Sequence, residues 1–337
     1  MITSIYQLAS PNVFSVKYQQ VDDSNGVIIR PDYLAICHAD QRYYRGLRDL
    51  QTLAKKLPMA LIHEGCGVVV SDKTGTFKAG QKVVMIPNVP GDEMDGIYEN
   101  YSKGSGFLSS GKDGFTCELV ILPPDRVVAY DAIPGNIAAI TEFVSVAVHA
   151  ATRLGVAAHQ YRDSIAIWGD GSLAYVVSLV LRKMYPDAKI TVVGLNPKKL
   201  SMFSFVDNTY LVSNIPEDFY CDHAFECAGG EGCASAIDGI IAHIKPQGTI
   251  MLMGVSESPV PIYTRMVLEK GLTVVGSSRS GRADFEKAVE IMSDVNVQHR
   301  LSAIILEDDG VREVKDLHRV FETDMTTAFK TVFKWDM

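Results

Sequence analysis

The sequence predicts an α/β protein in which an irregular β-rich domain is joined to a doubly wound parallel sheet. Two observations support this fold class. Residues 164–168 form a short apolar stretch that runs into a glycine-rich turn, and apolar strands and helices alternate after it. The part of the chain before this stretch instead shows short β-rich runs separated by Gly, Asp and Lys turns. The first pattern is typical of a dinucleotide-binding domain, and the second of an all-β domain.

The glycine-rich turn is the first candidate site. A tight turn is permitted by Gly169, and Gly171 lets the backbone approach a pyrophosphate, which would lie on the N-terminus of the next helix. The small Ala174 lets that helix pack close to the strand. Such turns also occur without a ligand, so the motif gains weight from the strands and helices after it in the chain. The candidate cofactor-binding residues are Gly169, Asp170, Gly171, Ser172, Leu173 and Ala174.

Strands and helices alternate along the chain after the turn. A helix is expected over 172–185, ended by Pro186, with others from Pro197 and over 231–244. Strands buried on both faces appear as continuous apolar runs rather than alternating patterns. The strands expected after the first one lie at 190–194, 209–212, 223–227, 249–254 and 272–276.

The end of the second strand predicts which dinucleotide is bound. NAD-preferring domains usually have Asp or Glu about 20 residues after the glycine motif, where it accepts hydrogen bonds from the ribose. Here Gly194 takes that place, so we expect no carboxylate there to bind the ribose or repel a 2′-phosphate. Asn196, Lys198 and Lys199 come next. The glycine leaves room for a 2′-phosphate, which these residues can bind, although both lysines could simply be solvated on a helix. We therefore expect NADP(H) rather than NAD(H).

The β-rich domain is expected to include residues from both ends of the chain. A helix over 283–293 and a strand over 330–334 come after the dinucleotide sheet, which is already complete. We expect this last segment to pack on the N-terminal domain. The N-terminal strands are expected near 27–29, 66–70, 82–86, 119–122 and 126–128.

Composition narrows the functional class. The chain has 337 residues, 47% of them hydrophobic and 21% charged, and this suits a two-domain enzyme. Its net charge of −8 argues against binding to nucleic acid or to an anionic membrane. No apolar run approaches the roughly 20 residues that span a bilayer, and no signal-peptide pattern is present. The six scattered cysteines do not suggest a disulfide framework, so we expect a cytoplasmic protein.

Three segments carry residue types that bind metals. The first contains Cys37 and Asp40, the second is His63-Glu64, and the third contains Glu142. Thiolate, imidazole and carboxylate ligands together suit zinc, and a site with an open position is catalytic in type. Each segment alone is weak evidence, because a lone cysteine is usually part of the core and His-Glu in a turn is usually on the surface.

The order of these segments before a dinucleotide fold resembles the zinc-containing medium-chain dehydrogenase/reductase family. The resemblance implies a GroES-like catalytic domain of residues 1–143 and 277–337 and a Rossmann domain of residues 144–276. It also implies one catalytic zinc, with Cys37 and His63 as ligands. Glu64 and Glu142 are the other ligand candidates, and the resemblance does not decide between them. Asp40 would orient the His63 ring.

The chain departs from the family pattern in three places. Ile62 replaces the usual glycine before the histidine. Cys117 is the one cysteine between residues 88 and 117, so the structural zinc site of alcohol-type members is absent. Ala39 replaces a Ser or Thr that relays a proton in those members. The proton would therefore have to be transferred by water, by a carboxylate, or by the hydroxyl group of Tyr43 or Tyr44.

Within this family the chain most resembles the ribulose-5-phosphate reductases of teichoic-acid and capsule synthesis. The similar segments include Asp40-Gln-Arg-Tyr-Tyr44, Trp168-Gly-Asp-Gly171 and His223-Ala-Phe-Glu-Cys227. The resemblance implies NADPH-dependent reduction of D-ribulose 5-phosphate to D-ribitol 5-phosphate, a precursor of CDP-ribitol. The substrate phosphate would need arginines. The candidates are Arg42, Arg45, Arg279 and Arg282.

Two other functions remain possible at this point. One is a zinc polyol dehydrogenase that acts on an unphosphorylated sugar alcohol. The other is a non-catalytic chain that serves as a scaffold for a cytidylyltransferase, against which the intact metal and cofactor motifs argue. A cytidylyltransferase is also a possible partner of an active enzyme. Members of the family are commonly homo-oligomers, and we expect the same here.

Overall fold

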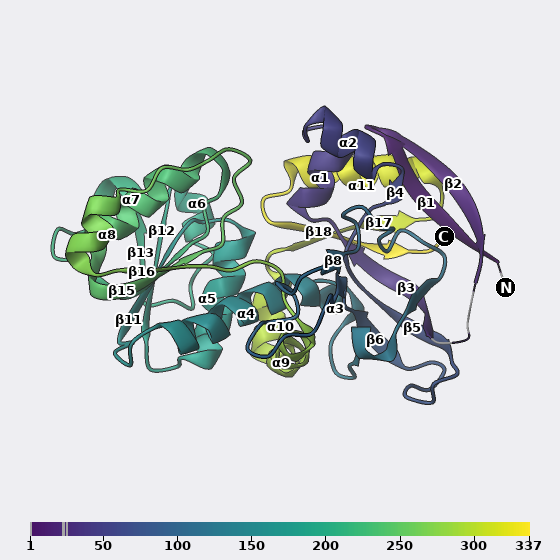
Figure 1. Cartoon of the computed structure of the whole chain (residues 1–337), viewed down its shortest axis with the longest axis horizontal. Helices are drawn as coiled ribbons and strands as arrows, with labels where there is room; N and C mark the ends of the chain where they lie inside the picture. The colour runs from purple at the N-terminus through teal and green to yellow at the C-terminus, as the bar shows by residue number, and fades with distance from the viewer. Residues whose placement is uncertain (1, 22–23, 25) are drawn as a thin grey trace. The chain divides into compact units, whose positions relative to one another are not determined.

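The computed structural model describes residues 2–21, 24 and 26–337 of the chain. The chain divides into two compact units (Figure 1). The first unit consists of residues 1–145 and 280–337, and the second of residues 146–279. The first unit is therefore discontinuous in sequence, with the second inserted into it.

The largest sheet of the first unit joins strands from both ends of the chain. Its order is β10-β6-β5-β3-β18-β17, and β9 also pairs with β3. The late strand β18 runs antiparallel to β3, with Val332 opposite Ala35, so the last segment does return to the N-terminal part. The strands are β3 (Val27–Ala35), β5 (Glu64–Asp72), β6 (Lys82–Met85), β9 (Val120–Leu122), β10 (Val127–Ala129), β17 (Ile305–Val311) and β18 (Lys330–Trp335).

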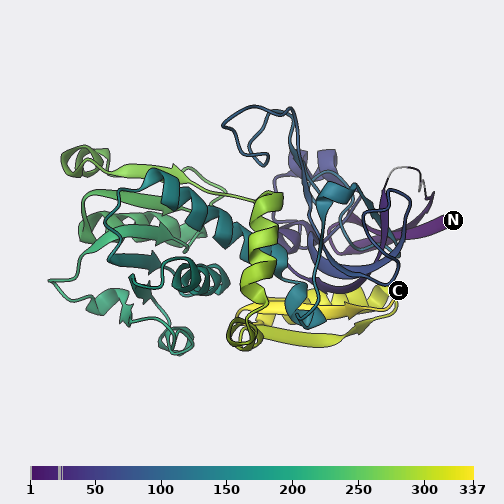
Figure 2. The ribbon, with the colours of Figure 1, turned by 90° about the horizontal axis from the view of Figure 1, so that it is seen from below.

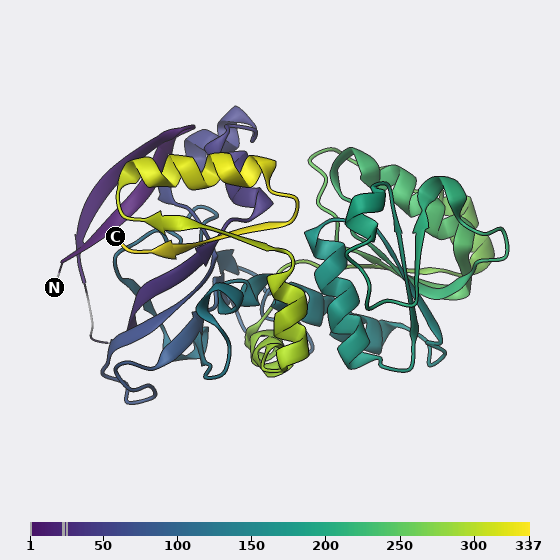
Figure 3. The same cartoon turned by 180° about the vertical axis from the view of Figure 1, so that it is seen from behind.

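Two smaller sheets and several helices complete this unit. Strand β1 (Ile2–Ser10) pairs with β2 (Val13–Gln20) and β4 (Met59–Ala60), and β7 (Asn88–Val89) pairs with β8 (Gly106–Phe107). Helix α11 packs against β17 and β18, as Figure 3 shows. Its Phe321 stacks on Tyr44 at 4.5 Å between ring centroids. The helices are α1 (His38–Tyr44), α2 (Leu50–Lys56), α3 (Gly135–Ala138), α9 (Arg282–Met292), α10 (Val295–Ser302) and α11 (Val314–Thr326), and α4 (Thr141–Ala157) begins here.

The second unit is built on one parallel sheet of six strands, as the sequence predicts. Its order, β13-β12-β11-β14-β15-β16, places β12 and β14 on either side of β11. The order therefore reverses at β11, which is where such sheets bind ligands beyond the carboxyl ends of their strands. The strands are β11 (Ser164–Trp168), β12 (Lys189–Gly194), β13 (Asn208–Leu211), β14 (Cys221–Glu226), β15 (Ile244–Leu252) and β16 (Thr273–Gly276).

Helices flank this sheet. Helix α5 (Ser172–Met184) packs against β11 and β12. Helix α7 (Cys233–His243) packs against β11, β14 and β15. Figure 2 shows this unit from below. Helix α8 (Thr264–Lys270) packs against β15. The helix expected from Pro197 is a single turn, α6 (Pro197–Leu200). Among the described residues, no helix is long and apolar enough to cross a membrane.

Candidate metal and cofactor sites

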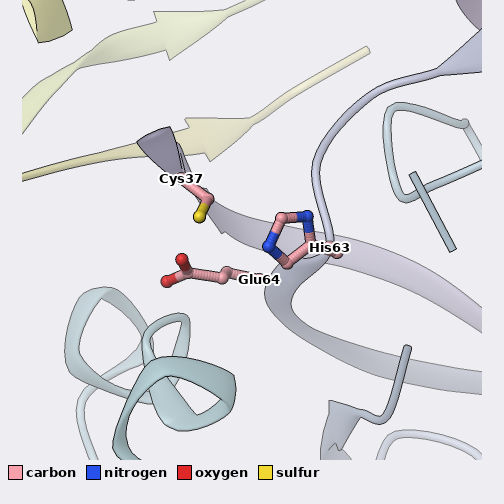
Figure 4. A group of neighbouring side chains, drawn as sticks. All are labelled: Cys37, His63 and Glu64. Atoms are coloured by element: carbon pink, nitrogen blue, oxygen red, sulfur yellow. The ribbon is translucent and has the colours of Figure 1, made fainter. Parts of the chain in front are cut away.

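Three of the expected metal ligands lie together in the first unit. Cys37 is the N-cap of α1, while His63 precedes β5 and Glu64 begins it. One potential ligand atom from each side chain lies within 4.8 Å of those from the other two. Figure 4 shows these three side chains, with one ring nitrogen of His63 turned toward the other two. His63 and Glu64 are buried and Cys37 is half-buried, so the group is partly shielded from water.

Asp40 connects the two segments that carry this group. Its Oδ2 accepts a hydrogen bond from the backbone N–H of Cys37 at 3.1 Å. Its Oδ1 accepts bonds from the N–H of Ile62 at 3.0 Å and from the Ser109 hydroxyl at 2.7 Å, and lies 3.6 Å from Nδ1 of His63. Burial raises the pKa of Asp40, but His63 and these hydrogen bonds outweigh it and leave the pKa below its ordinary value. Asp40 therefore ties the backbone of Cys37 to that of Ile62 and places its carboxylate beside the His63 ring.

Ile62 explains why the family has a glycine before the histidine. Its φ is +68°, in the left-handed region that β-branched residues rarely adopt. Such a conformation costs on the order of 1–3 kcal/mol. The side chain is fully buried and its N–H is bonded to Asp40, so packing and the hydrogen bond hold the strained backbone in place.

A buried lysine, for which the sequence carries no local signal, completes the surroundings of Glu64. Lys330, the first residue of β18, donates to Oε1 of Glu64 at 2.7 Å and to the carbonyl of Ile36 at 2.8 Å. Burial lowers the pKa of Lys330, but Glu64 and Cys37 outweigh it and raise the pKa above its ordinary value. Burial raises the pKa of Glu64, which Lys330 opposes. The other carboxylate oxygen, Oε2, is buried without a hydrogen-bond partner among the described residues.

Glu142 lies in the first turn of α4 and is also buried. Among the described residues it is not part of the group formed by Cys37, His63 and Glu64. Burial raises its pKa to about 7, and the negative charge of Glu64 adds to this rise, while His63 opposes it. Glu142 therefore belongs to the electrostatic surroundings of the group.

The electrostatics of the group favour a cation at its centre. Burial lowers the pKa of His63, yet Asp40 and Cys37 outweigh it and raise the pKa well above its ordinary value. The same negative neighbours would attract a metal ion, which competes with the proton for the imidazole. Together with the unpartnered Oε2 of Glu64, this chemistry fits a zinc ion with thiolate, imidazole and carboxylate ligands.

The two tyrosine hydroxyls considered for a proton relay have other partners. Tyr43 accepts a hydrogen bond from Lys56 at 3.0 Å. The hydroxyl of Tyr44 lies 2.9 Å from Nδ1 of His318 on α11. Both residues belong to the last turn of α1, and their side chains are buried in the core. These contacts give each hydroxyl a structural role.

The glycine turn of the second unit has the geometry that a close ligand requires. Gly169 has a φ of +135°, and a Cβ there would lie 2.8 Å from the backbone carbon of Cys227. Gly171 has ordinary extended dihedral angles, and a Cβ there would meet no described atom within 4 Å. Neither strain nor packing therefore accounts for Gly171, whereas the close approach of a pyrophosphate would. Ala174 is fully buried, and α5, which carries it, packs against β11.

The surroundings of Gly194 correct one expectation from the sequence. The absence of an acid at this position suggested that no carboxylate lies there, but Oδ2 of Asp170 accepts bonds from the N–H groups of Leu195 at 2.7 Å and Asn196 at 2.6 Å. The carboxylate comes from the glycine turn rather than from the end of β12. A Cβ at Gly194 would lie 2.6 Å from Cβ of Asp170, so the glycine also makes room for this side chain.

The residues after Gly194 form a capped turn. Oδ1 of Asn196 accepts bonds from the N–H groups of Lys198 at 3.0 Å and Lys199 at 3.2 Å. Asn196 is therefore the N-cap of α6. Lys198 is exposed and Lys199 is half-buried, and both follow Asn196, whose N–H bonds to the Asp170 carboxylate.

The four candidate arginines have different surroundings. Arg42 lies on α1 and Arg45 is its C-cap, in the helix that Cys37 begins. Arg279 has a φ of +59°, and is half-buried at the end of the second unit. Arg282 donates to the carbonyls of Pro124 at 3.2 Å and Val127 at 3.1 Å, and pairs with Glu286 at 2.9 Å. Its guanidinium is therefore engaged in holding the first unit together.

A parallel dinucleotide-type sheet and a cysteine–histidine–glutamate group together define a metal-dependent dehydrogenase. Family models agree with this class. Residues 23–133 match the alcohol dehydrogenase GroES-like domain, and residues 187–294 match the zinc-binding dehydrogenase model.

Full-length relatives place the chain more narrowly. It is 56% identical to a ribulose-5-phosphate reductase of Streptococcus pneumoniae over 100% of this chain and 98% of that protein. A ribulose-5-phosphate reductase of Bacillus spizizenii is 48% identical over the whole of both chains. The crystal structure of Staphylococcus aureus TarJ in complex with NADPH superposes with a TM-score of 0.89, at 43% identity over 100% of both chains. The chain belongs to the zinc-binding alcohol dehydrogenase family, and the two full-length relatives described above are named ribulose-5-phosphate reductases. The expected combination of a GroES-like domain and a Rossmann domain is thus confirmed.

Proposed function

We propose that this protein reduces D-ribulose 5-phosphate to D-ribitol 5-phosphate with NADPH and a bound zinc ion. The assembled group of Cys37, His63 and Glu64 is the observation that carries this proposal, because it supplies a metal site in a dehydrogenase fold. The names of the full-length relatives support the substrate, and the NADPH complex of TarJ supports the cofactor. The product would supply CDP-ribitol for teichoic-acid or capsule synthesis.

Cys37, His63 and Glu64 would hold the zinc. When bound, zinc supplies a Lewis acid for the ketone oxygen of the substrate. Asp40 bonds the backbone of Cys37 and lies beside the ring of His63, and it would help both ligands to keep their positions. Lys330 balances the charge of Glu64 and leaves Oε2 available as a ligand atom. Glu142 remains the alternative carboxylate ligand, and its burial near the group supports a role there.

The glycine turn of the second unit would bind the pyrophosphate of NADPH at Gly171 and the N-terminus of α5. When bound, NADPH would supply a hydride for C2 of the ketone, and a proton that comes ultimately from solvent would complete the new hydroxyl group. Lys198 and Lys199 would pair with the 2′-phosphate. Oδ2 of Asp170 near this corner accepts two backbone hydrogen bonds, which hold the carboxylate against the backbone of Leu195 and Asn196.

The phosphate of the substrate would be bound by arginines. Arg42 and Arg45 are supported by their place on the helix that begins at Cys37. Arg279 is a third candidate. The engagement of Arg282 with two carbonyls supports a structural role for it instead.

The test measures NADPH oxidation with purified, zinc-loaded protein. Ribulose 5-phosphate should be reduced, and the product should be ribitol 5-phosphate by mass spectrometry and NMR. Equal or better kcat/KM with unphosphorylated ribulose or xylulose would favour the polyol dehydrogenase alternative. No turnover of any ketose by protein that contains zinc and binds NADPH would favour the non-catalytic scaffold.

A further inference from the structure

A fully buried carboxylate lies at the carboxyl end of β14, in the second unit. Glu226 is the last residue of that strand and has no exposed surface. Its Oε1 accepts hydrogen bonds from the N–H groups of Ala228 at 2.9 Å and Gly229 at 2.8 Å. Its Oε2 accepts one from the N–H of Gly254 at 2.8 Å, which also donates to the backbone carbonyl of Glu226 at 3.1 Å. One side chain therefore binds the turns that come after two neighbouring strands, β14 and β15.

The glycine-rich turn after β11 is joined to the same arrangement. Glu226 is paired with Trp168, the residue before Gly169, in the parallel ladder. The N–H of Cys227 donates to the carbonyl of Trp168 at 2.8 Å. A Cβ at Gly169 would lie 2.8 Å from the backbone carbon of Cys227, so these two turns pack backbone against backbone.

The turns after β14 and β15 also contact each other directly. The N–H of Gly230 donates to the carbonyl of Val255 at 2.9 Å. A Cβ at Gly254 would lie 2.5 Å from both carboxylate oxygens of Glu226 and from the nitrogen of Gly229. Ala228 and Val255 are exposed, whereas the carboxylate behind them is not. The exposed residues of these turns therefore cover the buried carboxylate of Glu226, which bonds to the backbone of both turns.

A charged side chain is a costly way to satisfy three backbone N–H groups. A buried carboxylate must recover its lost hydration through hydrogen bonds, and charge-assisted bonds are shorter and stronger than neutral ones. Water would satisfy the same N–H groups if these turns were free to move, since they lie at the surface. The carboxylate instead fixes the backbone of these turns. They lie at the edge of the sheet where doubly wound folds bind their ligand.

We propose that Glu226 is a positioning residue for the dinucleotide, which fixes the turns at 227–230 and 253–255 against the glycine motif before NADPH binds. The inference rests on the proposed NADPH-dependent function. Glu226 itself has no exposed surface through which it could contact the cofactor. It acts through Ala228, Gly229 and Gly254, whose backbone it holds in place, so that NADPH does not have to order these turns when it binds.

Glu226→Gln tests this with little change in shape. The amide replaces one carboxylate oxygen with an NH₂ group, so at least one of the three backbone N–H groups then faces a donor. The control is Asp222→Asn at the opposite end of the same strand. Asp222 is also buried, and accepts bonds from the N–H of Ser164 at 2.8 Å and from Lys245 at 2.7 Å. Both variants lose a buried carboxylate of β14, but only Glu226 lies at the cofactor end.

The Kd for NADPH is measured by fluorescence titration in the absence of sugar phosphate, below the thermal midpoint of every variant. We expect Glu226→Gln to raise it about tenfold or more, the effect of losing one charge-assisted bond. Asp222→Asn should leave it within about twofold of the parent value. At saturating NADPH, the KM of Glu226→Gln for ribulose 5-phosphate should be unchanged. An unchanged Kd in Glu226→Gln, or an equal rise in Asp222→Asn, would show a purely structural role and overturn the proposal.

Two further outcomes are distinguishable. A parent protein that binds no NADPH contradicts the proposed function itself. If Glu226→Gln does not fold, amide hydrogen exchange of the cofactor-free parent decides. Slow exchange at Ala228, Gly229 and Gly254 supports preformed turns. Exchange as fast as in an open loop, slowed only by NADPH, overturns the inference.

Discussion

Lys330 Nζ lies 2.7 Å from Oε1 of Glu64, and the side chains of this ion pair are 5% and 0% exposed. The two residues come from opposite ends of the chain and meet where β18 begins, beside the candidate metal ligands. The ammonium group also lies 4.6 Å from the centre of the Phe143 ring. Lys330 therefore stabilises a buried negative charge that a metal site requires.

Replacing Lys330 with Met should destabilise the protein strongly. Removing one partner of a buried ion pair leaves the other charge uncompensated and costs about 3–5 kcal/mol. Lys334→Met on the same strand is the control, because Lys334 is exposed and its pairing with Asp336 is worth about 1 kcal/mol or less. Chemical denaturation of the metal-free parent and of the two variants measures the free energy of unfolding of each. Equal effects of the two substitutions would contradict a special role for Lys330.

One zinc ion per chain is expected, with no structural zinc. Cys37→Ser or His63→Ala should abolish zinc binding and activity while the fold is retained, since the first unit has its own hydrophobic core. Cys66→Ala is the matched control, since Cys66 is buried three residues from His63 but bonds to the carbonyl of Gly135. Elemental analysis and circular dichroism test this. Two zinc ions per parent chain, or full activity after exhaustive chelation, would refute it.

The unmutated enzyme should prefer NADPH to NADH. Gly194→Asp should reduce this preference by adding negative charge near the 2′-phosphate. Gly194→Ala separates charge from bulk, because its Cβ alone would displace Asp170, from whose Cβ it would lie 2.6 Å. Both variants should bind NADPH more weakly, and the ratio of kcat/KM for NADPH to that for NADH should fall further in Gly194→Asp. Comparable kcat/KM for both cofactors in the parent enzyme would contradict this.

Alanine at the true phosphate ligand should raise the KM for ribulose 5-phosphate about tenfold to a hundredfold, the effect of a lost charge-assisted bond. Arg42, Arg45 and Arg279 are tested singly, and NADPH binding should not change. Arg282→Ala should instead lower the thermal midpoint, because its guanidinium bonds to Pro124 and Val127. If no variant raises this KM more than about threefold, the phosphate site lies elsewhere.

His223, on β14, is hydrogen-bonded to a backbone group through each of its ring nitrogens. Its Nδ1 accepts a hydrogen bond from the N–H of Thr249 at 3.1 Å, so Nε2 carries the proton and donates to the carbonyl of Tyr161 at 3.0 Å. A second proton would have to bind to Nδ1, where it would point at the N–H of Thr249. Burial lowers the pKa of His223 to about 4, and the nearby His159 adds to this.

Stability should therefore fall as the pH is lowered from about 6.5, the ordinary histidine value, toward 4. In this window the unfolded chain binds a proton that the folded chain does not, and the loss reaches about 3 kcal/mol at pH 4. His223→Gln should show a smaller drop in thermal midpoint between pH 7 and pH 5 than the parent. The exposed His299→Gln is the control and should behave like the parent. Identical pH profiles for parent and His223→Gln would contradict this assignment.

The sequence predicted the elements whose signals are local. The strand at 164–168, the turn at Gly169 and the six-stranded parallel sheet can be read from contiguous apolar runs and glycines, and all are present. The metal group was predicted from segment order, and the structure brings Cys37, His63 and Glu64 together.

Contacts between distant residues were not predictable in the same way. Lys330 and Glu64 are 266 residues apart, and a lysine in a short strand normally indicates an exposed position. The Asp170 carboxylate beside Gly194 depends on how two loops meet, which no local pattern encodes. The left-handed backbone conformation of Ile62 could not be predicted, because β-branched residues rarely adopt this conformation.

The pairing of β3 with β18 has a consequence for how the protein is made. During synthesis, the first strand of this pair leaves the ribosome almost three hundred residues before the second, as the separation of Ile36 from Lys330 shows. The inserted unit has a complete sheet of its own and can fold in the interval. Until β18 emerges, β3 lacks one neighbour and Glu64 its countercharge. A nascent chain arrested before residue 330 should therefore hold a folded dinucleotide sheet and an immature metal site.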